Sequence, residues 1–106
     1  MSWHEAEKYC IQRKGHLVST HNDAEFQFTQ TNLTNTIIWI GLHSTDNCTT
    51  WEWTDESSFD FPKWVTNSSP VCNNQNSNTC IFEIVHGFAN FNNCTHSLPG
   101  VCKMTQ

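Results

Sequence analysis

The sequence has few charged residues and very few basic ones. Only 14% of its 106 residues are Asp, Glu, Lys or Arg, and five Lys and Arg stand against ten Asp and Glu, for a net charge of −5. The only adjacent basic pair is Arg13-Lys14. Nucleic acids and anionic membranes attract clustered positive charge, so neither is expected as a partner.

Long hydrophobic runs are also missing. No apolar stretch approaches the roughly 18 residues that a membrane span needs, and no signal-peptide pattern is present. This segment is therefore not expected to insert into a membrane. Because secretion requires a signal peptide during synthesis, the chain is expected to be part of a longer protein.

The motifs of metal and catalytic sites are absent as well. The sequence holds no C-x-x-C pair, no H-E-x-x-H and no G-x-S-x-G, and its six histidines are scattered. Zinc binding and nucleophilic catalysis therefore lack a motif. We expect a protein that is not an enzyme.

Six cysteines are present, an even number, in a chain that is 37% hydrophobic. One domain of this size gains only marginal stability from its core, and disulfides often supply the remainder in oxidising compartments. Extracellular localisation, either secreted or as the ectodomain of a membrane protein, is the prediction. Four N-x-S/T sequons agree with it and mark N-glycosylation candidates at Asn32, Asn47, Asn67 and Asn93.

Local patterns predict two helices followed by strands. Ser2 and Glu5 form a capping box before a helix that Gly15 should end, and Asn22 and Glu25 repeat the signal before a helix from about Asp23 to the early thirties. The segments predicted as strands are HLVST, IIWIGL, TTWEWTD, CIFEIV and PGVCKM, at 16–20, 37–42, 49–55, 80–85 and 99–104. The stretch 56–79 lacks periodicity. Helices followed by strands indicate an α+β fold with an antiparallel sheet.

These segments together resemble the C-type lectin-like domain family. The resemblance covers SWHEAEKYC, GHLVSTHND, WIGL, WEWTD with FDFPKW, and CTHSLPGVC, in that order along the chain. It implies one domain over residues 1–106, with two helices, antiparallel sheets, a long loop region and disulfide links. Domains of this family usually begin with a strand before the first helix, so the chain is expected to be a fragment lacking that strand. The resemblance also implies three disulfides: Cys10–Cys102, Cys80–Cys94 and Cys48–Cys72.

Members of this family that bind sugar through calcium share E-P-N or Q-P-D in the long loop and W-N-D before a framework cysteine. Calcium takes six to eight oxygen ligands, charged carboxylates among them. From residue 61 to residue 106 the only Asp or Glu is Glu83, whereas eight asparagines occur there. Amide oxygens are neutral and would hold calcium weakly.

The positions that match these motifs agree with the carboxylate count. Ala89-Asn90-Phe91 stands where W-N-D is expected, and Ser69-Pro70-Val71 contains the only proline near the other motif. Asn78, two residues before Cys80, stands where calcium binders often have Glu. No cofactor is therefore expected, and calcium is kept as the alternative.

The resulting prediction is a non-catalytic recognition domain that binds a protein or glycan through its long-loop face, about Trp64 to Thr79 with Gly87 to Asn93. Its predicted ligand-binding residues are Asn73, Asn74, Asn78, Asn90 and Phe91. Most tryptophans, and Phe88 and Phe91, are expected to pack inside, although either phenylalanine could instead contact a partner. Two alternatives stay open: a divergent calcium-dependent lectin using Asn73, Asn78 and Asn90, and a structural module shielded by glycans at Asn67 and Asn93. Oligomeric state is left open.

Overall fold

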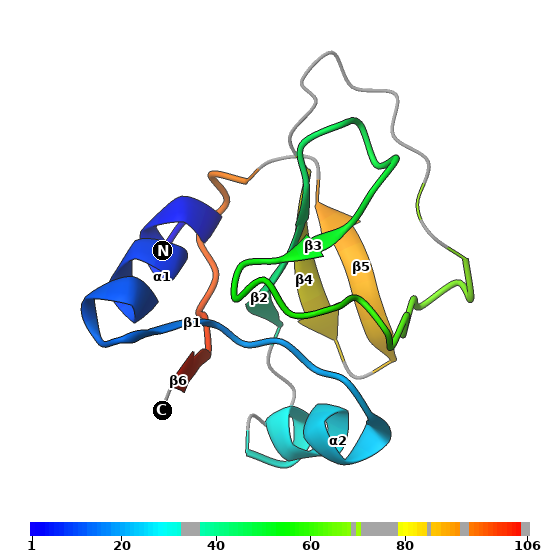
Figure 1. The fold of residues 1–106 in the computed structure, drawn as a ribbon, viewed down its shortest axis with the longest axis horizontal. Coiled ribbons are helices and arrows are strands. Elements are labelled where there is room, and N and C mark those ends of the chain that lie inside the picture. Colours follow the sequence, from blue (N-terminus) through cyan, green and yellow to red (C-terminus); the bar gives the residue numbers. More distant parts are fainter. Residues whose placement is uncertain (33–36, 69, 71–78, 85, 92–93, 105–106) are drawn as a thin grey trace.

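The structure is a computed structural model that describes residues 1–32, 37–68, 70, 79–84, 86–91 and 94–104. A two-stranded sheet with the order β1-β6 lies beside α1, and a four-stranded sheet with the order β3-β2-β4-β5 forms the centre (Figure 1). The paired strands in both sheets are antiparallel. The elements are α1 (Trp3–Gln12), β1 (Gly15–Leu17), α2 (Asp23–Asn32), β2 (Ile38–Ser44), β3 (Glu52–Trp53), β4 (Thr79–Ile84), β5 (Gly87–Phe91) and β6 (Cys102–Met104). The predicted α+β class is confirmed.

Helix α1 begins with the predicted capping box. Glu5 N donates to Ser2 Oγ, and Ser2 N donates to Glu5 Oε1 at 2.8 Å, so two otherwise unpaired backbone donors are satisfied. The predicted stop at Gly15 was wrong. The helix ends at Gln12, and Lys14 takes the left-handed conformation with a φ of 64°, so that Gly15 is free to begin β1.

Helix α2 also begins as predicted, with a variation in its cap. Asn22 Oδ1 accepts a hydrogen bond from Glu25 N at 2.9 Å, while Glu25 Oε1 accepts from His21 N at 2.6 Å rather than from Asn22 N. The reciprocal bond therefore reaches one residue further back than in a capping box. Phe26 and Thr29 are buried and lie on the face of this helix that packs toward the sheet.

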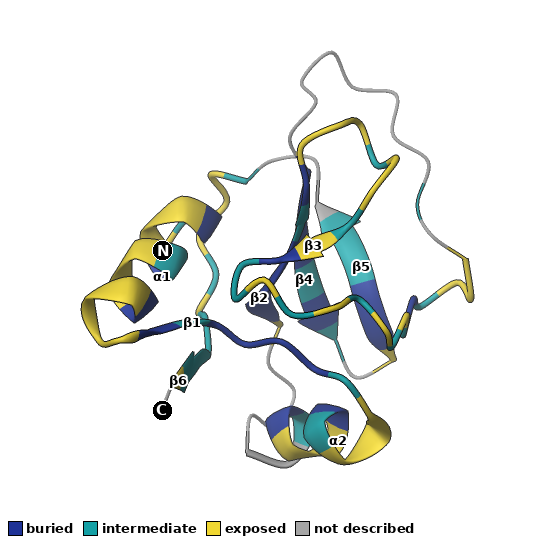
Figure 2. Ribbon diagram, viewed as in Figure 1, coloured by how far each residue is buried: buried dark blue, intermediate teal, exposed yellow. Residues whose placement is uncertain are grey.

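Buried side chains concentrate on the central sheet, as Figure 2 shows, while both helices expose their outer sides. Strand β2 is buried along most of its length because α1 and the β1 region cover one face, and a core cluster that includes Trp53, Trp64 and Phe88 covers the other. This explains why its sequence reads as a continuous apolar run instead of alternating. Neither helix in the described part of the chain has the length and apolar character needed to cross a bilayer.

Three strand predictions need correction. Of the predicted strand TTWEWTD, only Glu52 and Trp53 form β3. The predicted strand HLVST is mostly not strand, because β1 ends at Leu17. Strand β5 was not predicted, because GFANF lacks the β-branched residues that mark strands. It forms through pairing of all five of its residues with β4, from Cys80 opposite Phe91 to Ile84 opposite Gly87.

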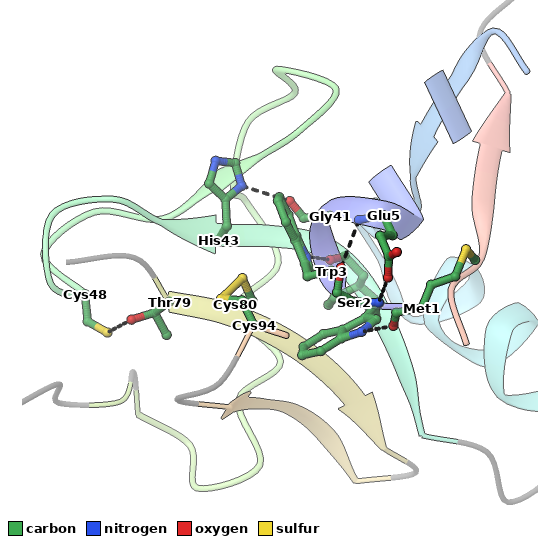
Figure 3. The surroundings of a disulfide bond; sticks show 12 residues. Met1, Ser2, Trp3, Glu5, Gly41, His43, Cys48, Thr79, Cys80 and Cys94 are labelled. Atoms are coloured by element: carbon green, nitrogen blue, oxygen red, sulfur yellow. Dashed lines mark hydrogen bonds between the residues drawn. A yellow bond between two sulfur atoms is a disulfide. The ribbon is translucent and has the colours of Figure 1, made fainter. Parts of the chain in front are cut away.

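Two of the three expected disulfides lie within the described residues and are confirmed. Cys10–Cys102 joins α1 to β6, and Cys80–Cys94 joins β4 to the segment before β6 (Figure 3). Cys48 is also disulfide-bonded, and its Sγ lies 3.4 Å from Thr79 Oγ1. Its expected partner, Cys72, lies outside the described residues.

Candidate recognition site

The segment from Lys63 to Val65 runs alongside β5 and forms one wall of the predicted long-loop face. Phe88 N donates to Lys63 O at 2.7 Å, and Val65 N donates to Phe88 O at 3.0 Å. Gly87 makes this approach possible. Its φ is 135°, and a Cβ there would lie 2.2 Å from Lys63 O, so a larger residue would both strain the backbone and collide.

A groove of about 290 Å³ lies between this segment and β5. Residues from the chain after Lys63 and from β5 line it: Trp64, Val65, Thr66, Ser68, Pro70, Phe88, Ala89 and Asn90. Trp64 and Phe88 are buried and form its apolar base, whereas Thr66 and Ser68 are exposed at its rim. The groove thus combines aromatic surface with hydroxyl and amide groups. None of the described residues that line the groove is charged.

An aromatic cluster supports the groove from below. The ring centroids of Trp64 lie 6.1 Å from Phe88, 5.8 Å from Phe59 and 4.9 Å from Trp51. Phe88 is fully buried, which confirms the packing prediction for it, and four of the five tryptophans are buried. Trp51 is the exception, being only partly buried.

The predicted ligand-binding residues are described to different extents. Asn90 is half-buried and lines the groove. Phe91 ends β5, but its side chain is not among those described. Three further predicted residues, Asn73, Asn74 and Asn78, lie outside the described residues. The structure therefore places one of the five predicted side chains in a defined groove.

The glycosylation candidates can be placed in part. Asn47 and Asn67 are exposed and have positive φ values of 59° and 64°. Asn67 stands between Thr66 and Ser68, both of which line the groove. Asn32 ends α2, and Asn93 lies outside the described residues. A glycan at Asn67 would thus sit at the edge of the groove.

The only Asp or Glu from residue 61 onward, Glu83, does not line the groove. Glu83 is 0% exposed and accepts hydrogen bonds from α2, at 2.5 Å from both Thr29 Oγ1 and Gln30 Nε2. Burial raises the pKa of Glu83, and these two hydrogen bonds offset part of that rise. Among the described residues, no three His, Cys, Asp or Glu side chains gather in a group suited to a metal ion.

Two larger hollows lie away from the predicted face. One, of about 510 Å³, lies between α2 and β6, and there Lys103 Nζ is 3.4 Å from Glu25 Oε2. The other, of about 590 Å³, lies between α1 and the β2–β3 region. The smaller groove is the better candidate for the predicted site, because it alone of the three contains Asn90.

Comparison with known proteins identifies the family. The family described as "Lectin C-type domain" matches residues 1–104. "Snaclec 3" from Daboia siamensis is 35% identical over 109 residues, covering 97% of this chain and 68% of its own length. "C-type lectin BML-1" from Bungarus multicinctus is 38% identical over 113 residues, covering 96% of this chain and 70% of its own.

Solved structures share the fold. A calcium-independent type II antifreeze protein superposes with a TM-score of 0.83 at 24% identity, covering 96% of this chain and 77% of its own. The cow C-type carbohydrate-recognition domain of CD23 has a TM-score of 0.81 at 26% identity, covering 100% of this chain and 82% of its own. With a family match across almost the whole sequence and the same arrangement of helices and sheets, this chain belongs to the C-type lectin domain family.

Proposed function

We propose that this chain is an extracellular, non-catalytic recognition domain that binds a protein or glycan through its long-loop face without the usual calcium site. The observation that carries the proposal is the groove beside β5. Its described lining has hydroxyl, amide and aromatic groups but no carboxylate. Sites of this kind bind by shape and hydrogen bonding.

The disulfides support the extracellular part of the proposal. Disulfides persist in oxidising compartments and are rare in the reducing cytosol. Cys10–Cys102 and Cys80–Cys94 are both formed, and Cys48 is bonded too. One relative, 42% identical over 56% of this chain, is named a killer cell lectin-like receptor.

The expected mechanism is surface complementarity at the groove. The Asn90 amide offers both a donor and an acceptor, and the hydroxyls of Thr66 and Ser68 add adaptable groups at the rim. Thr66 Oγ1 donates to Ser68 O at 3.1 Å, which orders this rim. Because Glu83 is buried against α2, calcium binding at this face would depend on neutral oxygens, which favours metal-independent binding.

A glycan array measured with and without a calcium chelator tests the proposal. Binding that survives chelation and falls about tenfold in Asn90→Ala would support it, because a buried hydrogen-bonding group typically contributes on the order of 1 to 2 kcal/mol. Gln12→Ala, an exposed change on α1, is the matched control and should bind normally. Binding abolished by chelation, together with micromolar calcium affinity by titration calorimetry, would overturn it in favour of the calcium-dependent lectin.

One observation favours the shielding alternative. Asn67 lies at the edge of the groove, between two of its lining residues, and is fully available to solvent on the surface. Mass spectrometry of the native glycoprotein should show partial or absent occupancy at Asn67 if the groove is a binding site. Full occupancy at both Asn67 and Asn93, with no glycan or protein binding, would support a shielded structural module instead.

A further inference from the structure

A fourth pocket, besides the groove and the two hollows described above, lies on β3 and the turn that follows it. It has a volume of about 400 Å³ and shares no lining residue with the groove beside β5. Three aromatic side chains, from Trp51, Trp53 and Phe59, form much of its wall. Trp51 and Phe59 are only partly buried, so part of each side chain remains accessible. The pocket is therefore accessible to a ligand and is walled by aromatic rings.

Two glutamates complete this wall. The side chain of Glu52 is 67% exposed, and its nearest ion-pair contact is a distance of 4.0 Å to His43 Nε2. Glu56 is exposed and forms no ion pair among the described residues. No Lys or Arg is among the described residues that line this pocket. At the edge of the aromatic pocket, Glu52 thus has only the distant His43 imidazole, and Glu56 has no ion-pair partner in the described part of the chain.

Neighbouring groups strengthen the negative charge. Burial raises the pKa of Asp55, but hydrogen bonds from Ser19 and Ser57 and the nearby Lys103 ammonium more than offset this, so the pKa lies below its usual value and the side chain is ionised at neutral pH. The adjoining 590 Å³ hollow shares Glu52, Trp53 and Glu56 with the pocket, and its described lining also holds Glu7 and the histidines His4, His16 and His43. Glu7 is paired with His16 at 2.7 Å, so the unpaired acidic groups are confined to the pocket itself.

Trp53 provides a further, independent observation. Its side chain is 2% exposed, and its indole N–H has no hydrogen-bond acceptor in the described part of the chain. A buried donor without an acceptor costs free energy. This unpaired donor belongs to one of the residues that line the pocket.

We propose that this pocket receives a cationic side chain, arginine in particular, from a partner protein. A guanidinium stacks on aromatic faces and pairs with carboxylates, so Trp51 and Phe59 would flank its plane while Glu52 and Glu56 accept its N–H groups. The partner is a protein with an exposed basic segment, for which the net charge of −5 provides a favourable long-range field. The site goes beyond the function proposed above, since it shares no lining residue with the groove and needs no glycan.

The test is a titration of the whole chain with the peptide N-acetyl-Gly-Arg-Gly-amide, followed by the NMR signal of the Trp51 indole N–H. The neutral control peptide carries citrulline, which keeps the shape of arginine and removes its charge. The arginine peptide should bind at least about tenfold more tightly, and raising the salt concentration should weaken it. Equal binding of the two peptides would overturn the proposal.

Variants test the assignment of residues. Glu56→Gln and Glu52→Gln should each weaken binding of the arginine peptide by about twofold to fivefold, because each removes one exposed carboxylate. Glu5→Gln is the matched control, since it also removes one negative charge but lies on α1 and can keep the capping box. Trp51 packs against Trp64, so Trp51→Ala would remove a packing contact as well as a wall of the pocket. The glutamate variants therefore decide the result.

The outcomes also separate this site from the groove. Asn90→Ala should leave binding of the arginine peptide unchanged, so failure of one proposal would not imply failure of the other. A neutral methyl glycoside that shifts the Trp51 signal, when the arginine peptide does not, would identify the pocket as a sugar site and overturn the cationic assignment.

Discussion

Thr29 Oγ1 lies 2.5 Å from Glu83 Oε2 and 2.7 Å from the carbonyl oxygen of Phe26. The hydroxyl has a single proton for these two acceptors. Glu83 Oε2 also accepts from Gln30 Nε2 at 2.5 Å, so two side chains of α2 reach this buried carboxyl. The contact joins α2 to β4, so the charge state of one buried carboxyl affects how the helix packs on the sheet.

Glu83→Gln should therefore change how stability depends on pH. Because the pKa of Glu83 is raised in the folded chain, its contribution is complete below the unfolded value, near 4.5, and is lost as pH rises through the folded value. Glu83→Gln carries no such loss. The variant should gain unfolding free energy relative to the native sequence by up to about 1.4 kcal/mol per pH unit within that window.

Urea unfolding at several pH values from 4 to 7 measures this difference. Glu52→Gln is the matched control, since its side chain is 67% exposed and its loss removes a charge without altering the core. A constant difference between Glu83→Gln and the native sequence at all pH values would contradict the assignment of a raised pKa.

The two described disulfides should differ in their contributions. Cys10–Cys102 closes a sequence separation of 92 residues, and Cys80–Cys94 closes one of 14. On the chain-entropy account, replacing both cysteines of the first pair by alanine should cost about 4 to 5 kcal/mol, and of the second about 3 kcal/mol. Denaturant unfolding of the two double variants measures this order, and an equal or reversed order would show that native packing outweighs chain entropy.

Gly87→Ala should weaken the groove. The added Cβ would strain a backbone with a φ of 135° and collide with Lys63 O, the acceptor of the Phe88 N–H. Loss of about 1 to 3 kcal/mol in unfolding free energy is expected, with reduced binding at the groove. His86→Ala, at the exposed neighbouring position, should change neither quantity, and a crystal structure of the variant would show whether residues 63–65 separate from β5.

Local signals predicted the helices well and the strands less well. The boxes at Ser2 and Asn22 depend on residues close in sequence, so α1 and α2 began where expected. Strand β5 escaped prediction because GFANF has little intrinsic strand preference and takes that form through hydrogen bonds to β4. The end of α1 was also misplaced, because Lys14, and not Gly15, takes the left-handed conformation after the helix.

The sequence by itself determined the class of the fold, the cysteine content and the scarcity of carboxylates after residue 61, because these follow from composition, spacing and short-range capping. Only the tertiary structure decided where those groups point. Pairing of β5 with β4 placed Asn90 beside the segment 63–65, packing of α2 buried Glu83, and the turn after β3 left Glu52 and Glu56 beside Trp51. The first two depend on contacts between residues distant in the chain, and such contacts form only when the core assembles.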